Sequence, residues 1–430
     1  MSSEQEKLAI VVSGGPAPGI NSVIGAAAIR ACLSDVEVLG IQDGFRWLVE
    51  GDTDHVMALS IADTSRIHFR GGSHIGISRV SPKTPEQMAR TLDALDRLGV
   101  GKLITIGGDG TATLAHKLAK AARDKGFELA VVHVPKTIDN DIALPHETST
   151  FGFQTARHVG CEIVENLMVD AKTTSRWYFV LAQGRKAGHL ALAIGKAAGA
   201  TLSLIPEEFP RETTHFKTLV DTLAGAILKR ASYGRSDGVA MIAEGLSERV
   251  PLEELEGHTD IPRDAHGNIA VAQINLCEIL RGAVLKRLEE FGFKATIMGK
   301  SIGYELRCAD PIPFDMEYTR DLGYCAARYI IEGGTEAMVA LENGSFRAIP
   351  FTDMIDLETG KSRVRMVDTQ SDRYKIARSY MLRLKPEDFR DPHELSRLAA
   401  VARISPDAFR DEFAHVVHAE PRHVHPTLPP

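Results

Sequence analysis

The 430-residue sequence is poor in cysteine and has no excess of basic residues. Its five cysteines are scattered, and no two of them form a CxxC pair. An odd number of separated cysteines indicates neither a disulfide framework nor a zinc site, and it is typical of a reducing compartment, so we expect a cytoplasmic protein. The formal net charge of −7 argues against a general nucleic-acid-binding protein.

Long hydrophobic runs are also absent. No stretch of 18 apolar residues occurs, so we expect no membrane span. The N-terminal residues MSSEQEKL are polar and acidic, unlike a signal or transit peptide. With 44% hydrophobic and 25% charged residues, the composition is that of a globular protein, and the length suggests two or three domains.

Short apolar runs alternate along the chain with longer segments of helical periodicity. We predict strands at residues 8–12, 36–41, 102–106, 129–134, 177–181, 201–205 and 237–244, and helices at 21–33, 86–98, 111–125, 190–198 and 216–229. Alternating apolar strands and helices are typical of parallel sheets covered on both faces. The pattern predicts an α/β fold with two Rossmann-like three-layer αβα domains and mainly parallel sheets.

Three of the predicted strands end in loops of unusual composition. They read SGGPAPG at residues 13–19, GGDGT at 107–111 and PKTIDND at 135–141. Ligands of parallel sheets bind beyond the carboxyl ends of the strands, where these loops would meet. The glycines allow backbone N–H groups to approach a phosphate, and a carboxylate beside them suits Mg²⁺.

Each loop also has a structural interpretation without function. The first is compatible with a tight strand-to-helix turn, and Asp109 or Thr111 with a helix cap. An Asx turn would explain Asp139 and Asp141, which otherwise offer a general base and a metal or orienting ligand. The functional interpretation is favoured because one parallel sheet brings all three loops to one edge.

These residues resemble the phosphofructokinase family. Further similarity lies in RGGSHIGISR at 70–79, QGR at 183–185, AEG at 243–245 and YELR at 304–307, and the match covers most of residues 8–324 in the family's order. The resemblance implies phosphorylation of fructose 6-phosphate at its 1-hydroxyl to fructose 1,6-bisphosphate, a step of glycolysis, with Mg²⁺ as cofactor. Related lipid and NAD kinases share GGDGT but not the other elements, and a noncatalytic subunit would lack Asp139 or Asp109.

The resemblance also implies roles for individual residues. Asp139 matches the catalytic base, Asp109 the magnesium ligand, and Arg79 a residue near the transferring phosphate. Contacts to the donor phosphates are implied for Gly15, Arg79, Gly108, Asp109, Gly110 and Thr111. Contacts to the sugar phosphate are implied for Thr137, Ile138, Asp139, Arg176, Gln183, Gly184, Arg185, Glu244, Lys294, Tyr304 and Arg307. Because Arg176 and Lys294 match positions that reach a neighbouring subunit, a homodimer or homotetramer is expected.

Two positions bear on the phosphoryl donor. In the family, pyrophosphate enzymes carry Asp at the position of Gly110 and Lys at that of Lys136, whereas many ATP enzymes carry Gly at both. This sequence is mixed. Gly110 leaves space for a nucleotide α-phosphate, whereas a lysine excludes nothing. We therefore expect MgATP as the donor, with Lys136 as a catalytic cation. The alternative is a reversible pyrophosphate-dependent phosphotransferase.

The resemblance also divides the chain. Residues 1–150 are expected to form the donor domain, completed by a segment near 308–355, and residues 151–307 the sugar-phosphate domain. A C-terminal helical extension is predicted at 356–419, and a disordered tail at 420–430, which is rich in proline. No effector site is evident.

Overall fold

The computed structural model describes residues 7–145, 148–184, 186–210, 214–256, 275–354 and 363–417. The chain divides into two compact units. The first combines Met1–Val159 with Gly303–Arg365, and the second combines Gly160–Ile302 with Met366–Pro430. Both contain a mainly parallel sheet covered by helices, so the predicted fold class is confirmed.

The first unit contains a seven-stranded sheet in the order β11-β10-β5-β4-β1-β2-β3. Its strands are β1 (Lys7–Val12), β2 (Val38–Ile41), β3 (Val56–Ala58), β4 (Val100–Gly107), β5 (Ala130–Pro135), β10 (Ala337–Glu342) and β11 (Ser345–Pro350). All neighbours are parallel except β3 and β11, which pair antiparallel at the two edges. The central strands are buried almost throughout, because helices cover both faces.

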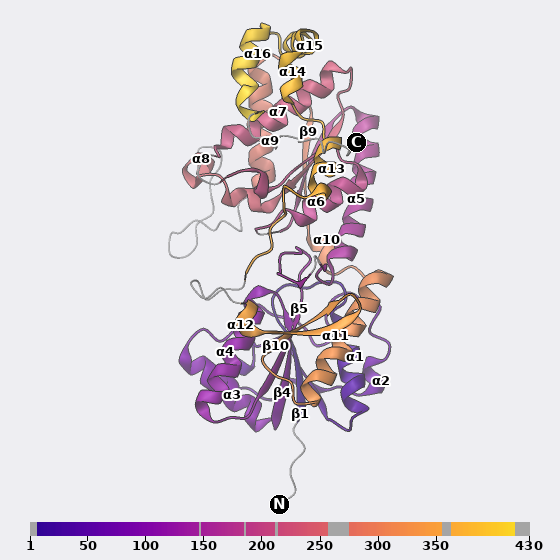
Figure 1. The fold of residues 1–430 in the computed structure, drawn as a ribbon, viewed down its shortest axis with the longest axis vertical. Helices are drawn as coiled ribbons and strands as arrows, with labels where there is room; N and C mark the ends of the chain where they lie inside the picture. Colours follow the sequence, from indigo (N-terminus) through magenta and orange to yellow (C-terminus); the bar gives the residue numbers. More distant parts are fainter. Residues whose placement is uncertain are drawn as a thin grey trace, which may run out of the picture. The chain divides into compact units, whose positions relative to one another are not determined.

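Helices α1 (Ile20–Cys32) and α11 (Pro313–Ile331) lie together on one side of this sheet, and α3 (Pro85–Arg97) and α4 (Asp109–Lys125) on the other (Figure 1). Gly323 on α11 allows the first pair to pack closely, since a Cβ there would lie 2.4 Å from the carbonyl oxygen of Val23. The unit also contains the short helices α2 (Ile61–Thr64), α10 (Tyr304–Arg307) and α12 (Phe351–Met354).

The second unit is built on a four-stranded parallel sheet in the order β7-β8-β6-β9. The strands are β6 (Trp177–Ala182), β7 (Leu202–Leu204), β8 (Gly238–Ala243) and β9 (Ile297–Ile302). Its helices are α6 (His189–Ala198), α7 (Phe216–Ser232), α8 (Leu252–Glu256) and α9 (Leu276–Glu290), together with most of α5 (Phe153–Thr174), which begins in the first unit.

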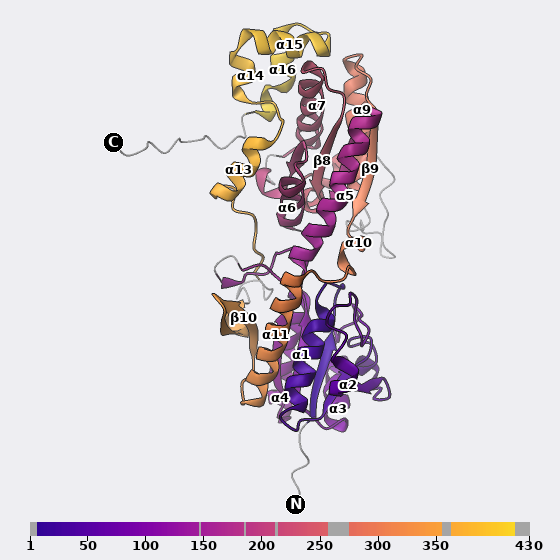
Figure 2. The same cartoon turned by 90° about the vertical axis from the view of Figure 1, so that its right-hand side faces the viewer.

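The C-terminal part of the second unit is helical. It contains α13 (Asp372–Tyr380), α14 (Pro386–Arg390), α15 (Pro392–Ala402) and α16 (Pro406–Phe413), and α14–α16 lie beside one end of α7 (Figure 2). A buried ion pair between Lys229 Nζ and Asp388 Oδ2, 2.6 Å apart, joins this part to α7. The predicted tail at 420–430 lies outside the described residues.

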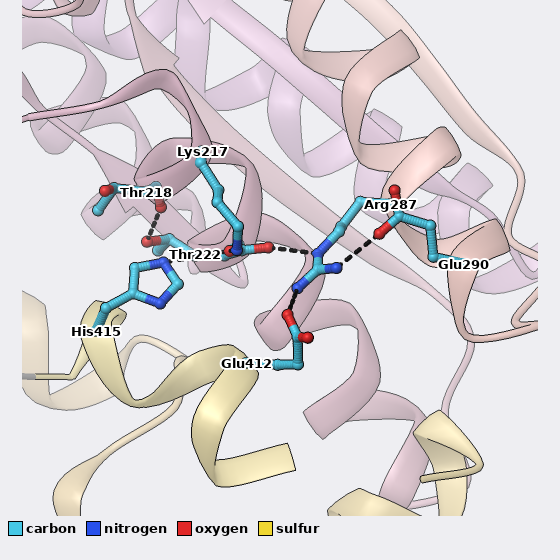
Figure 3. Close-up of polar contacts among 8 residues, drawn as sticks. Lys217, Thr218, Thr222, Arg287, Glu290, Glu412 and His415 are labelled. Atoms are coloured by element: carbon cyan, nitrogen blue, oxygen red, sulfur yellow. Dashed lines mark hydrogen bonds and ion pairs between the residues drawn. The ribbon is translucent and has the colours of Figure 1, made fainter. Parts of the chain in front are cut away.

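A second polar cluster holds α16 and the residues after it against α7 and α9 (Figure 3). The fully buried carboxylate of Asp221 accepts a hydrogen bond from Arg287 Nε at 2.8 Å, forms an ion pair with Lys217 and lies 3.2 Å from His415 Nε2. Arg287 also donates to Glu412 on α16 at 2.6 Å. The donors around Asp221 offset the cost of removing its charge from water.

Across the part of the chain that the structure describes, none of the helices combines the length and apolar character needed to cross a membrane.

Candidate active site

The three polar loops of the first unit meet at one edge of its sheet. Strands β5, β4 and β1 are adjacent and parallel, so their carboxyl ends lie side by side. Backbone hydrogen bonds continue past the strand ends, from Lys136 N to Gly107 O at 2.8 Å and from Ser13 N to Ile106 O at 2.9 Å. A further bond from Gly14 N to Ser78 O, 2.9 Å, places the loop that carries Arg79 beside them.

Lys136 is a buried cation at the centre of this edge. Its side chain is 4% exposed, and its Nζ donates a hydrogen bond to the carbonyl oxygen of Gly15. Burial lowers the pKa of the Lys136 ammonium to about 8; Arg307 and Arg79 act in the same direction, whereas Asp139 and Asp141 oppose it. Even so, the side chain of Lys136 is protonated in most of the protein molecules at pH 7.

Two guanidinium groups lie next to the same glycine. A Cβ at Gly15 would lie 3.4 Å from Arg307 Nη1 and 3.9 Å from Arg79 Nη2. Lys136, Arg79 and Arg307 therefore surround the Gly15 backbone. Three cations beside glycine backbone have the charge and the N–H donors that suit a multiply charged anion such as a phosphate group.

The GGDGT loop opens helix α4, and Asp109 occupies its first turn. Asp109 is exposed, and its Oδ1 accepts a hydrogen bond from Gly110 N at 2.7 Å. Gly108 precedes the helix and Thr111 is buried behind it. Within the described ranges, no three or more His, Cys, Asp or Glu side chains gather into a metal site. A single carboxylate such as that of Asp109 suits Mg²⁺ that takes its other ligands from phosphates and water.

The loop after β5 is held by its own side chains. Asp139 N donates to Thr137 Oγ1 at 3.0 Å, and the Thr150 hydroxyl donates to Thr137 O at 2.7 Å. Ile138 is 5% exposed and anchors the loop in the core. Asp139 itself is half-buried and lies close enough to Lys136 to raise the pKa of the ammonium. A carboxylate in this position can accept a proton from a bound hydroxyl.

In the second unit, the structure brings Glu244 and Gly184 together. Glu244 begins the 3₁₀ turn after β8, and its Oε2 accepts a hydrogen bond from Gly184 N at 3.0 Å. Gln183 N donates to Ile302 O at 3.2 Å. These residues follow the carboxyl ends of β6 and β8. Arg185 lies outside the described residues.

Arg176 and Lys294 lie at the opposite end of that sheet. Arg176 immediately precedes β6, and Lys294 lies three residues before the start of β9. Trp177 N donates a hydrogen bond to Thr296 O, so the starts of β6 and β9 lie side by side. Strand β6 lies between Arg176 and Gln183, which are seven positions apart, a distance of about 23 Å at roughly 3.3 Å per residue. These two cations therefore do not join Gly184 and Glu244 within one chain.

The YELR segment forms the short helix α10 of the first unit. The Arg307 guanidinium lies 4.5 Å from the centre of the Tyr304 ring, and Tyr304 is 76% exposed. Arg307 Nε is buried and has no hydrogen-bond partner among the described residues. Tyr304 thus supports the guanidinium through its ring.

One residue at this site has no counterpart in the sequence predictions. Arg365 Nε donates to Asn140 O at 3.0 Å across 225 positions of the chain. Neither periodicity nor a motif marks this arginine, so only its tertiary contact makes it visible.

The family model for phosphofructokinase matches residues 7–330. The chain belongs to the phosphofructokinase family. Among curated members, a pyrophosphate–fructose 6-phosphate 1-phosphotransferase of Thermotoga maritima is 49% identical and covers 95% of this chain and 98% of its own length. A Naegleria fowleri protein of the same name is 42% identical, with 95% of both chains covered.

Solved phosphofructokinase structures have the same fold. The pyrophosphate-dependent enzyme of Marinobacter aquaeolei superposes with a TM-score of 0.65 at 18% identity, over 87% of this chain and 90% of that one. The T-state Pichia pastoris enzyme gives a TM-score of 0.63 at 23% identity, over 82% of this chain and 36% of that one. At these identities the likeness concerns the fold alone.

The expectation of ATP as the donor was wrong. It is overturned by these phosphofructokinase relatives at 49% and 42% identity, both named as pyrophosphate enzymes. A Cβ at Gly110 would meet nothing within 4 Å, and a pocket of about 500 Å³ lined in part by Gly110, Lys83 and Thr113 lies beside it. Gly110 thus removes an obstacle to a nucleotide, but an open volume provides no affinity for one. Lys136, by contrast, is a buried cation beside two guanidinium groups, and a fixed charge of this kind attracts phosphate strongly.

Proposed function

We propose that this protein is a pyrophosphate-dependent fructose 6-phosphate 1-phosphotransferase. The main support is the similarity to two enzymes of that name over 95% of the chain. The charge at the sheet edge agrees with it, because Lys136, Arg79 and Arg307 surround the Gly15 backbone. Inorganic pyrophosphate carries several negative charges and no base or sugar, so cations can supply most of its recognition.

In the proposed reaction, the Asp139 carboxylate takes the proton of the sugar 1-hydroxyl. The freed oxygen attacks the terminal phosphorus of pyrophosphate, and a new P–O bond forms as the bridging P–O bond breaks. The bridging oxygen keeps the bond electrons and leaves as inorganic phosphate. Phosphoryl transfer of this kind depends on positioning and charge neutralisation more than on covalent help from the protein.

Lys136 is assigned to the donor phosphates. Its Nζ is anchored on Gly15 O, so the ammonium is held in one place and has further N–H donors for a ligand. A buried ammonium stabilises the charge that grows on the leaving phosphate more strongly than a solvated one would. Arg79 shares the charge of the donor, and Arg307, which the resemblance assigns to the sugar phosphate, lies beside the same Gly15.

Mg²⁺ is the proposed cofactor, with Asp109 as its protein ligand. When bound, it would neutralise charge on the donor phosphates. Asp109 lies in the first turn of α4, so its carboxylate would be close to a phosphate-bound ion near the helix N-terminus.

In the second unit, the sugar phosphate is assigned to Glu244, Gly184 and Gln183, with Arg176 and Lys294 supplied by a neighbouring subunit. The position of Arg176, a strand length from Gln183, supports this division of the site between two chains. We therefore propose a homodimer or homotetramer that acts in the cytoplasm as part of glycolysis.

A direct test compares initial rates on one preparation with fructose 6-phosphate, Mg²⁺ and either pyrophosphate or ATP. Pyrophosphate should support turnover much faster than ATP, and adding inorganic phosphate to fructose 1,6-bisphosphate should run the reaction backwards. Turnover with ATP alone, or with neither donor, would reject the proposed donor.

A further inference from the structure

Arg365 forms several hydrogen bonds with the loop that carries Asp139. Its Nε donates to Asn140 O at 3.0 Å and its Nη1 to Thr148 O at 2.9 Å, and its Nη2 donates to Asn140 Oδ1. Its backbone N donates to Asp141 O at 2.7 Å. One side chain thus contacts both ends of the segment 140–148.

Asn140, which follows Asp139 directly, adopts an unusual backbone conformation. Its φ is 57°, in the left-handed region that asparagine tolerates better than most residues, and it is 9% exposed. Its Oδ1 also accepts a hydrogen bond from Thr150 N at 3.0 Å. Such a conformation persists only where surrounding contacts hold it, and Arg365 and Thr150 provide them.

Asp139 is therefore held from both sides. Before it, Thr137 Oγ1 accepts a hydrogen bond from its backbone N–H. After it, Asn140 is fixed through its carbonyl and its side-chain oxygen. The direction in which the Asp139 carboxylate points depends on these two peptide groups.

We propose that Arg365 is a positioning residue for the general base, acting on Asp139 through Asn140. The planar guanidinium suits this task because three of its N–H groups reach acceptors that diverge from one another. A lysine at this position carries the charge but lacks the fork. This proposal rests on the proposed role of Asp139 in phosphoryl transfer.

The test compares Arg365→Met and Arg365→Lys with Arg363→Met, a control that removes an exposed arginine two positions earlier. Arg365→Met should lower kcat by a factor of about 10 to 10², since small misplacements of a catalytic group have effects of this size. The KM values for pyrophosphate and fructose 6-phosphate should change less than about threefold, because the contacts of Arg365 that carry this proposal are all to groups of the protein. Arg365→Lys should recover only part of the loss, and Arg363→Met should match the unchanged enzyme.

A double-mutant cycle separates positioning from general structural support. If Arg365 acts through the base, Arg365→Met should reduce kcat no further in an Asp139→Asn background. Equal losses in both backgrounds, or unchanged kcat in a folded Arg365→Met protein, would overturn the proposal. If Arg365→Met does not fold, Arg365→Lys takes its place in the cycle, and its losses of kcat in the two backgrounds are compared in the same way. An inactive unchanged enzyme would instead count against the proposed function.

Discussion

The ammonium of Lys136 is hydrogen bonded to the carbonyl oxygen of Gly15, and this contact joins the loop after β5 to the loop after β1. The two residues are 121 positions apart. The contact fixes the position of the Lys136 ammonium at the sheet edge. The nearby charges of Arg307 and Arg79 help to lower its pKa. Most of the expected behaviour of the site follows from that placement.

Replacing Lys136 should remove most of the phosphoryl transfer from pyrophosphate. Lys136→Met keeps the volume of the side chain but removes the charge, and turnover with pyrophosphate should fall by a factor of about 10² to 10³. Lys120→Met, an exposed position on α4, serves as the control and should change little. If Lys136→Met turned over within a few-fold of the unchanged enzyme, Lys136 would have no role in the reaction.

The alkaline limb of the pH profile should report the same group. Because the pKa of the Lys136 ammonium is about 8 in the ligand-free protein, the cation is lost as the pH rises through that value. The kcat/KM for pyrophosphate should therefore fall above about pH 8. Lys136→Arg keeps its charge throughout this range, so its alkaline limb should move to higher pH even at a reduced rate. Identical limbs in both proteins would assign the titration to another group.

Removing the base should affect turnover more than binding. Asp139→Asn keeps the shape of the side chain but accepts no proton, so kcat should fall by a factor of about 10² or more while substrate affinity is retained. Stopped-flow or equilibrium binding of fructose 6-phosphate checks the second part. Asp96→Asn on α3 is a charge-matched control away from the loops. Near-normal turnover of Asp139→Asn would show that another group takes the proton.

Sharing of sites between subunits can be tested by mixing two inactive variants. Arg176→Ala and Asp139→Asn chains, co-refolded or co-expressed, should regain activity because a mixed assembly contains sites with both native residues. Sedimentation of the unchanged protein should show a dimer or tetramer. A fully active monomer, or mixtures no more active than their parts, would contradict a shared site.

The Asp221 cluster should contribute to the stability of the second unit. Burial by itself raises the pKa of this carboxyl, but hydrogen bonds from His415, Lys217 and Arg287 outweigh it and hold the pKa below its ordinary value. Asp221→Asn should lower the free energy of unfolding by about 3 kcal/mol, because it removes one partner of a buried ion pair. Glu290→Gln, which alters an exposed partner of the same Arg287, should cost less than about 1 kcal/mol.

The pH dependence of this difference has a definite sign. A carboxyl whose pKa is lowered by folding stabilises the protein above its unfolded pKa of about 3.9, and the contribution is lost as the pH falls through the folded value. The gap between the unchanged protein and Asp221→Asn should therefore be constant near neutral pH and shrink below about pH 4. Urea titrations at several pH values would measure it, and a gap that widens on acidification would contradict the assignment.

The local pattern of the sequence was sufficient to predict much of the fold and the three loops. Strands β1, β4 and β5 each form a short apolar run that is buried on both faces, and such runs are visible without knowledge of their neighbours. Parallel strands of one sheet place their carboxyl ends at one edge, so the alternation of strands and helices was enough to predict that the glycine-rich loops, Asp109 and Lys136 meet there.

Only the tertiary structure decided which distant groups complete that edge. Arg365 reaches Asn140 across 225 positions, and its segment carries no periodicity that marks a role. Local periodicity encodes which face of an element is buried, whereas contacts between remote segments depend on how the packed elements bring them together. For that reason the sequence determined the scaffold and its reactive loops, and the folded chain determined what holds Lys136 and Asp139 in place.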